Sequence, residues 1–169
     1  KQACGMLRCD IEAALSIGMT TATQRSRALA IAAGNFVSAR PLGVIDGIDM
    51  GYTGRVRKID TESIRQRLDS GALVLISPLG HSLSGKTFNL SMGDIAEAAA
   101  IALAAEKLIY VVEQEGILNE HGTLISNLSA QEARELLDNQ RAQPNQRRLL
   151  QSAVNAVEKQ VQRTQILSG

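Results

Sequence analysis

Two continuous apolar runs constrain the fold of this chain more than any other feature. They are ALVLIS at 72–77 and KLIYVV at 107–112. An uninterrupted apolar run of this length is typical of a strand that is covered on both faces. The alanine-rich segment at 92–105 lies between them and is apolar on nearly every side, which predicts a buried helix. Two buried strands joined through a buried helix indicate a right-handed parallel crossover, and therefore an α/β fold.

The flanking segments extend this pattern to an α/β class with a hairpin insertion. Before the two apolar runs, the expected elements are a helix at 1–17, a strand at 31–40 ended by Pro41, a loop or broad hairpin up to Gly54, and a strand at 54–60. A helix over TESIRQRLDSG follows, capped by Asp60 and stopped at Gly71. After the runs, we expect a hairpin at 116–125 turning at Asn119–Gly122, a helix from a Ser129–Glu132 capping box through Leu137, a loop at 142–146, a helix at about 147–161 and a strand to Leu167.

Composition excludes several classes of partner. A chain of 169 residues is long enough for one domain with a core, and 44% hydrophobic residues argue against disorder. Aromatic residues are only 2%, so Ala, Leu, Ile and Val must fill the interior. A net charge of +1 gives no electrostatic reason to expect nucleic acid or an anionic membrane as a partner. No apolar run is long enough to span a bilayer.

The two cysteines indicate a reducing compartment. Cys4 and Cys9 lie roughly 140° apart around the predicted first helix, so they should neither bridge each other nor share a metal. Free thiols favour a cytoplasmic protein. The chain opens inside a predicted helix without a methionine and ends on a predicted strand, so we expect a fragment of a larger protein. We find no clustered metal ligands and no nucleophile–base pair, and we expect His81 and His121 to be solvated loop residues.

Residues 80–87, GHSLSGKT, match the spacing of a phosphate-binding P-loop. That site needs Lys86 and Thr87 in the first turn of the following helix, so that backbone N–H groups and the helix dipole face the phosphate. Ser91 and Asp94 instead predict a cap that starts the helix at about Met92. The context therefore favours an accidental match, with a P-loop nucleotide hydrolase kept as an alternative.

Several longer segments carry a more specific signal. They are Ala33-Gly34-Asn35-Phe36, Arg40-Pro41-Leu42-Gly43-Val44, Gly54-Arg55-Val56-Arg57 with Ile59-Asp60, and Phe88-Asn89-Leu90. Together with their surroundings, from the first helix to QRTQILSG, they strongly resemble the amino-acid kinase-like domain of the bacterial N-acetylglutamate synthase family. The resemblance implies a three-layer α/β sandwich of the amino-acid kinase (carbamate kinase-like) type, partial, with a mainly parallel sheet and a hairpin region.

The resemblance also implies a function. Full-length members of that family transfer an acetyl group from acetyl-CoA to glutamate, in the first step of arginine biosynthesis, and arginine inhibits them. Residues 1–169 would then be a partial kinase-like domain, without its N-terminal part and without the acetyltransferase domain that follows. We expect this segment to be regulatory and itself inactive, with no cofactor of its own and with L-arginine as its allosteric ligand. Acetyl-CoA would be the co-substrate of the whole protein. We expect that protein to be a cytoplasmic homo-oligomer, and the resemblance suggests a hexamer.

True acetylglutamate kinases, by the same resemblance, carry Asn-x-Asn-Ala-Asp at a strand–helix turn and a later Lys that holds the phosphates. This chain keeps Asn89, has Gly93 at the Asp position with Asp94 one step along, and has Leu149 in place of the Lys. Phosphoryl transfer depends on such charges, so their loss should abolish it. Asn89 and Asp94 would form a vestigial substrate pocket. An active acetylglutamate kinase remains an alternative.

Both residues have simpler interpretations as well. Asn89 could bind its own backbone in a turn, and Asp94 could be a first-turn acid of the helix. For arginine, the resemblance points to the last helix and the strand after it. A His lines the pocket there in many members, and Gln165 stands at that position, with Ser168 nearby. Each of these could instead be a strand residue that faces solvent.

Overall fold

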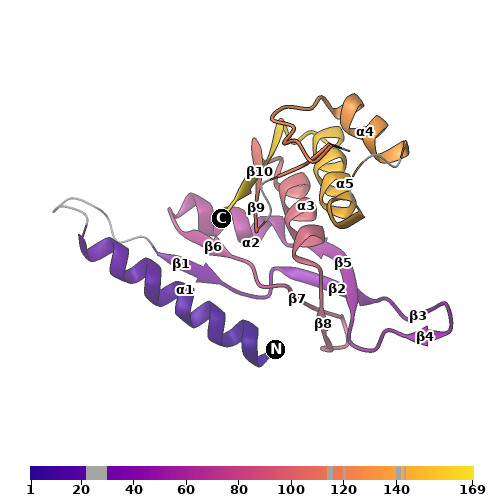
Figure 1. The fold of residues 1–169 in the computed structure, drawn as a ribbon. Coiled ribbons are helices and arrows are strands. Elements are labelled where there is room, and N and C mark those ends of the chain that lie inside the picture. Colours follow the sequence, from indigo (N-terminus) through magenta and orange to yellow (C-terminus); the bar gives the residue numbers. More distant parts are fainter. Residues whose placement is uncertain (22–29, 114–115, 120, 140–141, 143) are drawn as a thin grey trace. The chain divides into compact units, whose positions relative to one another are not determined.

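The computed structural model describes residues 1–21, 30–113, 116–119, 121–139, 142 and 144–169, which form two compact units, 1–95 and 96–169 (Figure 1). The elements of the first unit are α1 (Gln2–Thr21), β1 (Ile31–Ala33), β2 (Val37–Pro41), β3 (Val44–Ile45), β4 (Ile48–Asp49), β5 (Gly54–Ile59), α2 (Thr61–Asp69), β6 (Leu73–Leu75), β7 (Leu79–His81) and β8 (Thr87–Asn89). Helix α3 (Met92–Leu103) spans the boundary. The second unit continues with β9 (Lys107–Val112), α4 (Ala130–Asp138), α5 (Pro144–Glu158) and β10 (Arg163–Ser168).

A four-stranded mixed sheet in the order β5-β2-β7-β8 organises the first unit. The β2–β5 and β7–β8 pairs are antiparallel, and β2 and β7 are parallel. The sheet is packed tightly around Gly80, where an added Cβ would lie 2.7 Å from both Ala39 Cβ and Leu90 Cδ1. Only a glycine therefore allows β7 to lie this close to its neighbours.

The single strand predicted at 31–40 is wrong, because the chain changes sheets within it. β1 pairs in parallel with β6, whereas β2 lies in the four-stranded sheet. Gly34 and Asn35 separate the two strands, and both residue types are poor strand formers. Phe36 follows them and is buried. The aromatic side chain thus anchors the start of β2 in the core of the sheet.

The turns and caps of the first unit follow the sequence closely. Asp46 and Gly47 both have positive φ, of 50° and 79°, as a two-residue type I′ hairpin between β3 and β4 requires. The Asp60 side chain accepts the Ser63 N–H at 3.1 Å at the start of α2. Gly71, with φ of 82°, ends that helix in the left-handed conformation. The predicted hairpin and both helix boundaries are confirmed.

The second unit is built on the parallel pair of β9 and β10, in register from Lys107 opposite Arg163 to Val112 opposite Ser168. Helices α3 and α5 contribute to an apolar cluster with the inner face of β9. The buried members of that cluster are Ala100, Leu108, Tyr110, Ala153, Ala156 and Val161. A second cluster joins α4 and α5 to the segment before them, with Ile117, Ala133, Ala142, Leu150 and Val154.

One expectation about the apolar runs is wrong. β9 is covered on one face, since Leu108 and Tyr110 are buried while Ile109 and Val111 are 49% and 68% exposed. β6 pairs with β1 within the first unit, and β9 pairs with β10 within the second. An apolar run permits burial on both faces, but the strands and helices that are brought to it decide which face is covered and which strand becomes its neighbour.

The loop predicted at 142–146 is also wrong in its second half, because α5 begins at Pro144. Proline is favourable at the first helical position, where its missing N–H would have no helical partner and its fixed φ suits the helix. Gln146 consequently lies in the first turn of α5 and is only 1% exposed. The helix predicted at 1–17 is confirmed as α1, and its two cysteines are free thiols.

Candidate functional site

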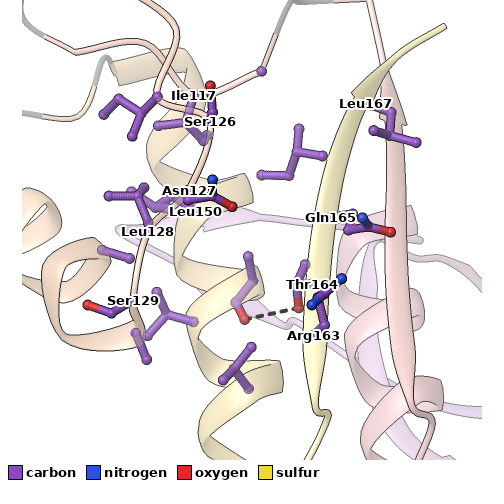
Figure 2. Close-up of a pocket in the computed structure, with 18 of the residues that line it drawn as sticks. Ile117, Ser126, Asn127, Leu128, Ser129, Leu150, Arg163, Thr164, Gln165 and Leu167 are labelled. Carbon is purple, nitrogen blue, oxygen red and sulfur yellow. Dashed lines mark hydrogen bonds between the residues drawn. The ribbon is translucent and has the colours of Figure 1, made fainter.

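A cavity of about 760 Å³ lies in the second unit between α5, β10 and residues 116–117 and 124–130 (Figure 2). We call it the β10 cavity. Its apolar lining includes Ile117, Leu128, Leu150 and Val154. Its polar lining includes Ser126, Asn127, Ser129 and Thr164. Polar and apolar groups contribute about equally to its surface. A concave site that combines apolar walls with convergent polar groups can hold a small molecule.

The hairpin predicted at 116–125 forms one wall of the β10 cavity. The Asn119 N–H donates to the Thr123 carbonyl at 2.9 Å, and the Ile125 N–H donates to the Ile117 carbonyl at 2.9 Å. The Asn119 side-chain oxygen also accepts the Thr123 N–H at 2.8 Å, which closes the turn. The turn at Asn119–Gly122 is thus confirmed for the described residues. Glu120 lies outside them.

The capping box at the start of α4 fixes the far end of that wall. The Ser129 hydroxyl accepts the Glu132 N–H at 3.2 Å, and the Ser129 N–H donates to Glu132 Oε2 at 2.8 Å. The Ser129 hydroxyl also donates to Glu132 Oε2 at 2.7 Å. The two bonds to the carboxylate favour its charged form, so the Ser129 backbone N–H and then its hydroxyl lower the pKa of Glu132. Arg134 forms an ion pair with Glu158 and connects α4 to α5. The predicted box is confirmed.

Strand β10 forms the opposite wall, and its side chains alternate between two faces. The Thr164 hydroxyl donates to the Ala153 carbonyl of α5 at 3.4 Å, so Thr164 faces the helix. Gln165 is the next residue and points to the other face of the strand. Figure 2 shows Gln165 and Leu167 turned away from Ser126–Ser129. Ser168 shares the face of Thr164 by the same alternation. The two predicted arginine-binding residues both border the cavity, but from opposite faces of β10.

The charge of the β10 cavity comes from a residue that was not among the predicted site residues. Among the described residues that line the cavity, Arg163 is charged and none carries a carboxylate. By the alternation along β10, Arg163 shares the face of Gln165. Such a cavity suits a ligand with a carboxylate and with donors that neutral oxygens can accept. The only signal in the sequence was a basic residue at the start of the last predicted strand.

The predicted vestigial residues Asn89 and Asp94 lie at one strand–helix turn in the first unit. Asn89 ends β8 with an exposed side chain, and its N–H donates to the Tyr52 carbonyl at 2.8 Å. Helix α3 begins at Met92, as predicted, and the Asp94 N–H donates to the Ser91 hydroxyl at 3.4 Å. Asp94 thus has the geometry of a first-turn acid in a capped helix, where the dipole favours it.

Residues 80–87 form a β-hairpin and not a phosphate-binding loop. The Ser82 N–H donates to the Lys86 carbonyl at 2.8 Å, and the Gly85 N–H donates to the Ser82 carbonyl at 3.0 Å. Thr87 opens β8 and pairs with His81. Lys86 therefore precedes a strand and does not lie in the first turn of a helix. The P-loop match is accidental, because its backbone N–H groups close a turn instead of a phosphate cradle.

The remaining candidates for chemistry are sparse. His81 and His121 are exposed, as predicted, and His121 lies in the hairpin turn. The loop predicted for His81 is wrong, because His81 ends β7 and pairs with Thr87. Within the described ranges, no three His, Cys, Asp or Glu residues gather closely enough to hold a metal ion. In the part of the chain that the structure covers, no helix has the length and apolar character needed to cross a membrane.

Comparison with curated proteins gives consistent relatives. The chain is 48% identical to an amino-acid acetyltransferase of Neisseria meningitidis serogroup B over 169 residues, which are 100% of this chain and 38% of that protein. It is 42% identical to an amino-acid acetyltransferase of Ralstonia nicotianae over 167 residues, 99% of this chain and 37% of the relative. The chain thus spans less than two fifths of the length of these relatives.

Solved structures agree with these relatives. An N-acetylglutamate synthase from Neisseria gonorrhoeae, complexed with coenzyme A and L-arginine, matches 99% of this chain and 39% of its own with a TM-score of 0.89 and 47% identity. A carbamate kinase from Giardia lamblia bound to AMP-PNP matches 69% of this chain and 41% of its own at a TM-score of 0.58 and 15% identity, which supports the fold alone. The predicted fold class is confirmed. The amino acid kinase family matches residues 2–168, and the chain belongs to that family.

Proposed function

We propose that this chain is the regulatory, arginine-sensing kinase-like segment of an N-acetylglutamate synthase, which as a whole protein acetylates L-glutamate from acetyl-CoA. The observation that carries the proposal is the 47% identity, over 99% of the chain, to a synthase that was crystallised with L-arginine and coenzyme A. The curated relatives are amino-acid acetyltransferases of greater length. Acetyl transfer would accordingly belong to a separate acetyltransferase domain outside residues 1–169, with acetyl-CoA as its co-substrate.

The lack of kinase chemistry in this segment is part of the proposal. Leu149, which replaces the phosphate-holding Lys by resemblance, packs against the apolar cluster around Leu108 and Tyr110. Gly93 brings no carboxylate to the turn, and Asp94 lies in the first turn of a capped helix. Phosphoryl transfer needs charges that face the phosphates, so an apolar contact at this position supports an inactive, vestigial pocket at Asn89 and Asp94.

We place the arginine along β10, in contact with the β10 cavity. Arg163 would bind the α-carboxylate of the ligand, because a guanidinium pairs well with a carboxylate. The guanidinium of the ligand would then lie away from Arg163, against neutral oxygens such as those of Ser126 and Asn127. An acidic partner for it would come from residues of the whole protein outside this chain. The segment alone should therefore bind arginine weakly.

The opposite faces of Gln165 and Ser168 make a sharp test possible. In the full-length protein, arginine affinity is measured by titration calorimetry for Gln165→Ala and Ser168→Ala, with Gln151→Ala as an exposed control on α5. We expect one of the two β10 variants to weaken binding by about tenfold, the value of one hydrogen bond to a charged ligand, and thereby to identify the face that holds it. Wild-type affinity in both variants would contradict this placement, and a full-length protein that does not bind arginine would contradict arginine sensing.

Enzyme assays of the full-length protein test the rest of the proposal. We expect acetylation of glutamate that depends on acetyl-CoA and falls when arginine is added. We also expect no ATP-dependent acyl-phosphate formation on N-acetylglutamate. Light scattering during size-exclusion chromatography measures the oligomer, for which we propose a homo-hexamer. Phosphorylation of N-acetylglutamate would show instead that the chain belongs to an active kinase.

A further inference from the structure

Gln146 is a buried glutamine whose side-chain amide is paired at both ends. It lies in the first turn of α5 and is 1% exposed. Its Nε2 donates to the Gly116 carbonyl at 2.8 Å, and its Oε1 accepts the Leu118 N–H at 3.0 Å. The amide thus satisfies both backbone groups that a neighbouring strand would have paired. Such an amide is costly to disturb, because the loss of either bond leaves a polar group unsatisfied.

These bonds hold the hairpin that forms the wall of the β10 cavity. Within that hairpin, Leu118 and Leu124 form a single isolated bridge, and Ile125 bonds Ile117. A two-stranded hairpin this short is not stable alone. Two polar anchors in the described chain hold it, the Gln146 amide at its start and the Ser129 capping box where α4 begins. The buried Ile117 adds apolar packing in the cluster with Leu150 and Val154. Residues 126–128 of the cavity lining lie between the two polar anchors.

We propose that Gln146 is the positioning residue of the β10 cavity: its amide sets the place of the wall formed by residues 116–119 and 121–129, and so determines the affinity of the amino-acid ligand bound there. The proposal rests on the proposed function for the identity of that ligand, L-arginine. Gln146 itself acts through the wall, since its amide is used by Gly116 and Leu118. Its effect on binding is therefore expected to come with a change in the mobility of the wall.

Three variants of the full-length protein separate the possibilities. Gln146→Ala removes both bonds. Gln146→Glu keeps an acceptor for the Leu118 N–H, but it loses the donor to the Gly116 carbonyl and places a carboxylate oxygen against that carbonyl. The matched control is Gln151→Ala on the same helix, where an exposed amide donates to Asn155 Oδ1 at 2.9 Å. If Gln146→Ala fails to fold, Gln146→Glu, which is of nearly the same size, keeps the proposal testable.

The measurements are backbone hydrogen exchange and arginine titration of the same samples. We expect both Gln146 variants to raise the exchange rate of peptides covering 116–129 by about tenfold and to leave β9 and β10 protected. We also expect them to weaken arginine binding by about tenfold. Gln151→Ala should change neither the exchange rate nor the arginine affinity. Faster wall exchange with unchanged arginine affinity would overturn the proposal, and so would wild-type exchange. If the wild-type protein binds no arginine, the proposed function fails, whereas the wall exchange still tests whether Gln146 positions the wall.

Discussion

Tyr110 and Ser152 join β9 to α5 through a buried hydrogen bond of 2.7 Å between their hydroxyl groups. The Ser152 hydroxyl also donates to Glu97 Oε2 of α3 at 2.7 Å. A carboxylate accepts hydrogen bonds, so the one proton of Ser152 goes to Glu97, and Tyr110 is the donor to Ser152. The three side chains form one series of hydrogen bonds, from Tyr110 through Ser152 to Glu97, that connects β9, α5 and α3 in the second unit.

Removing the Ser152 hydroxyl, the middle group of this hydrogen-bond series, should destabilise the second unit. We expect Ser152→Ala to cost about 1–3 kcal/mol, because it leaves the buried Tyr110 hydroxyl without this acceptor. Tyr110→Phe alone should cost about 1 kcal/mol, and the double variant should cost less than the sum. Urea unfolding measures the three values, with Ser126→Ala as an exposed control that should change stability little. Additive costs would show that the two hydroxyls are not coupled.

The close packing around Gly80 predicts a second stability effect. Gly80→Ala would place a Cβ 2.7 Å from Ala39 Cβ, so the sheet must open and lose about 1–3 kcal/mol. Gly5→Ala is the matched control, since nothing lies within 4 Å of its added Cβ in α1. That control should be neutral or stabilising by up to about 1 kcal/mol. Denaturant unfolding of both variants checks the prediction, and equal stability of the two would contradict it.

The cap of α2 should give a pH-dependent contribution. The Ser63 hydroxyl and then the Ser63 N–H hold the pKa of Asp60 below its ordinary value. A folded-state pKa that is lower than the unfolded one stabilises the protein above the ordinary value, about pH 4, and this contribution is lost as pH falls through the lower folded value. Ser63→Ala should lower the thermal midpoint at pH 7 and have a smaller effect at about pH 3. An equal loss at both pH values would rule out the charged cap as its source.

The hairpin at 80–87 predicts that Lys86 plays no part in nucleotide binding. We expect Lys86→Ala to leave the response to ATP and magnesium unchanged, since its neighbours form a turn between β7 and β8. Fluorescent ATP titration of wild type and variant measures this, with Lys58→Ala on β5 as a second exposed lysine. Saturable binding that disappears only in Lys86→Ala would overturn the hairpin interpretation.

The local features and the family follow from the residues themselves. The caps at Asp60 and Ser129, the start of α3 at Met92 and the turn at Asn119–Gly122 were predicted correctly, because each depends on residues within a few positions. The motifs between Gly34 and Leu90 also indicated the kinase-like fold, which the family match confirms. Local steric and hydrogen-bonding preferences are properties of short segments, so a sequence contains them directly.

The faces and partners that the elements use come instead from contacts between distant segments. β10 pairs with β9, and Ile109 remains exposed. Gln146 becomes a buried anchor because Gly116 and Leu118 reach it from nearly thirty residues earlier in the chain. The Thr164 hydroxyl donates to the Ala153 carbonyl on α5, so Thr164 faces that helix and the next residue, Gln165, points to the opposite face of β10. A periodic pattern in one segment fixes which of its residues share a face, but it does not specify the segment that will cover that face.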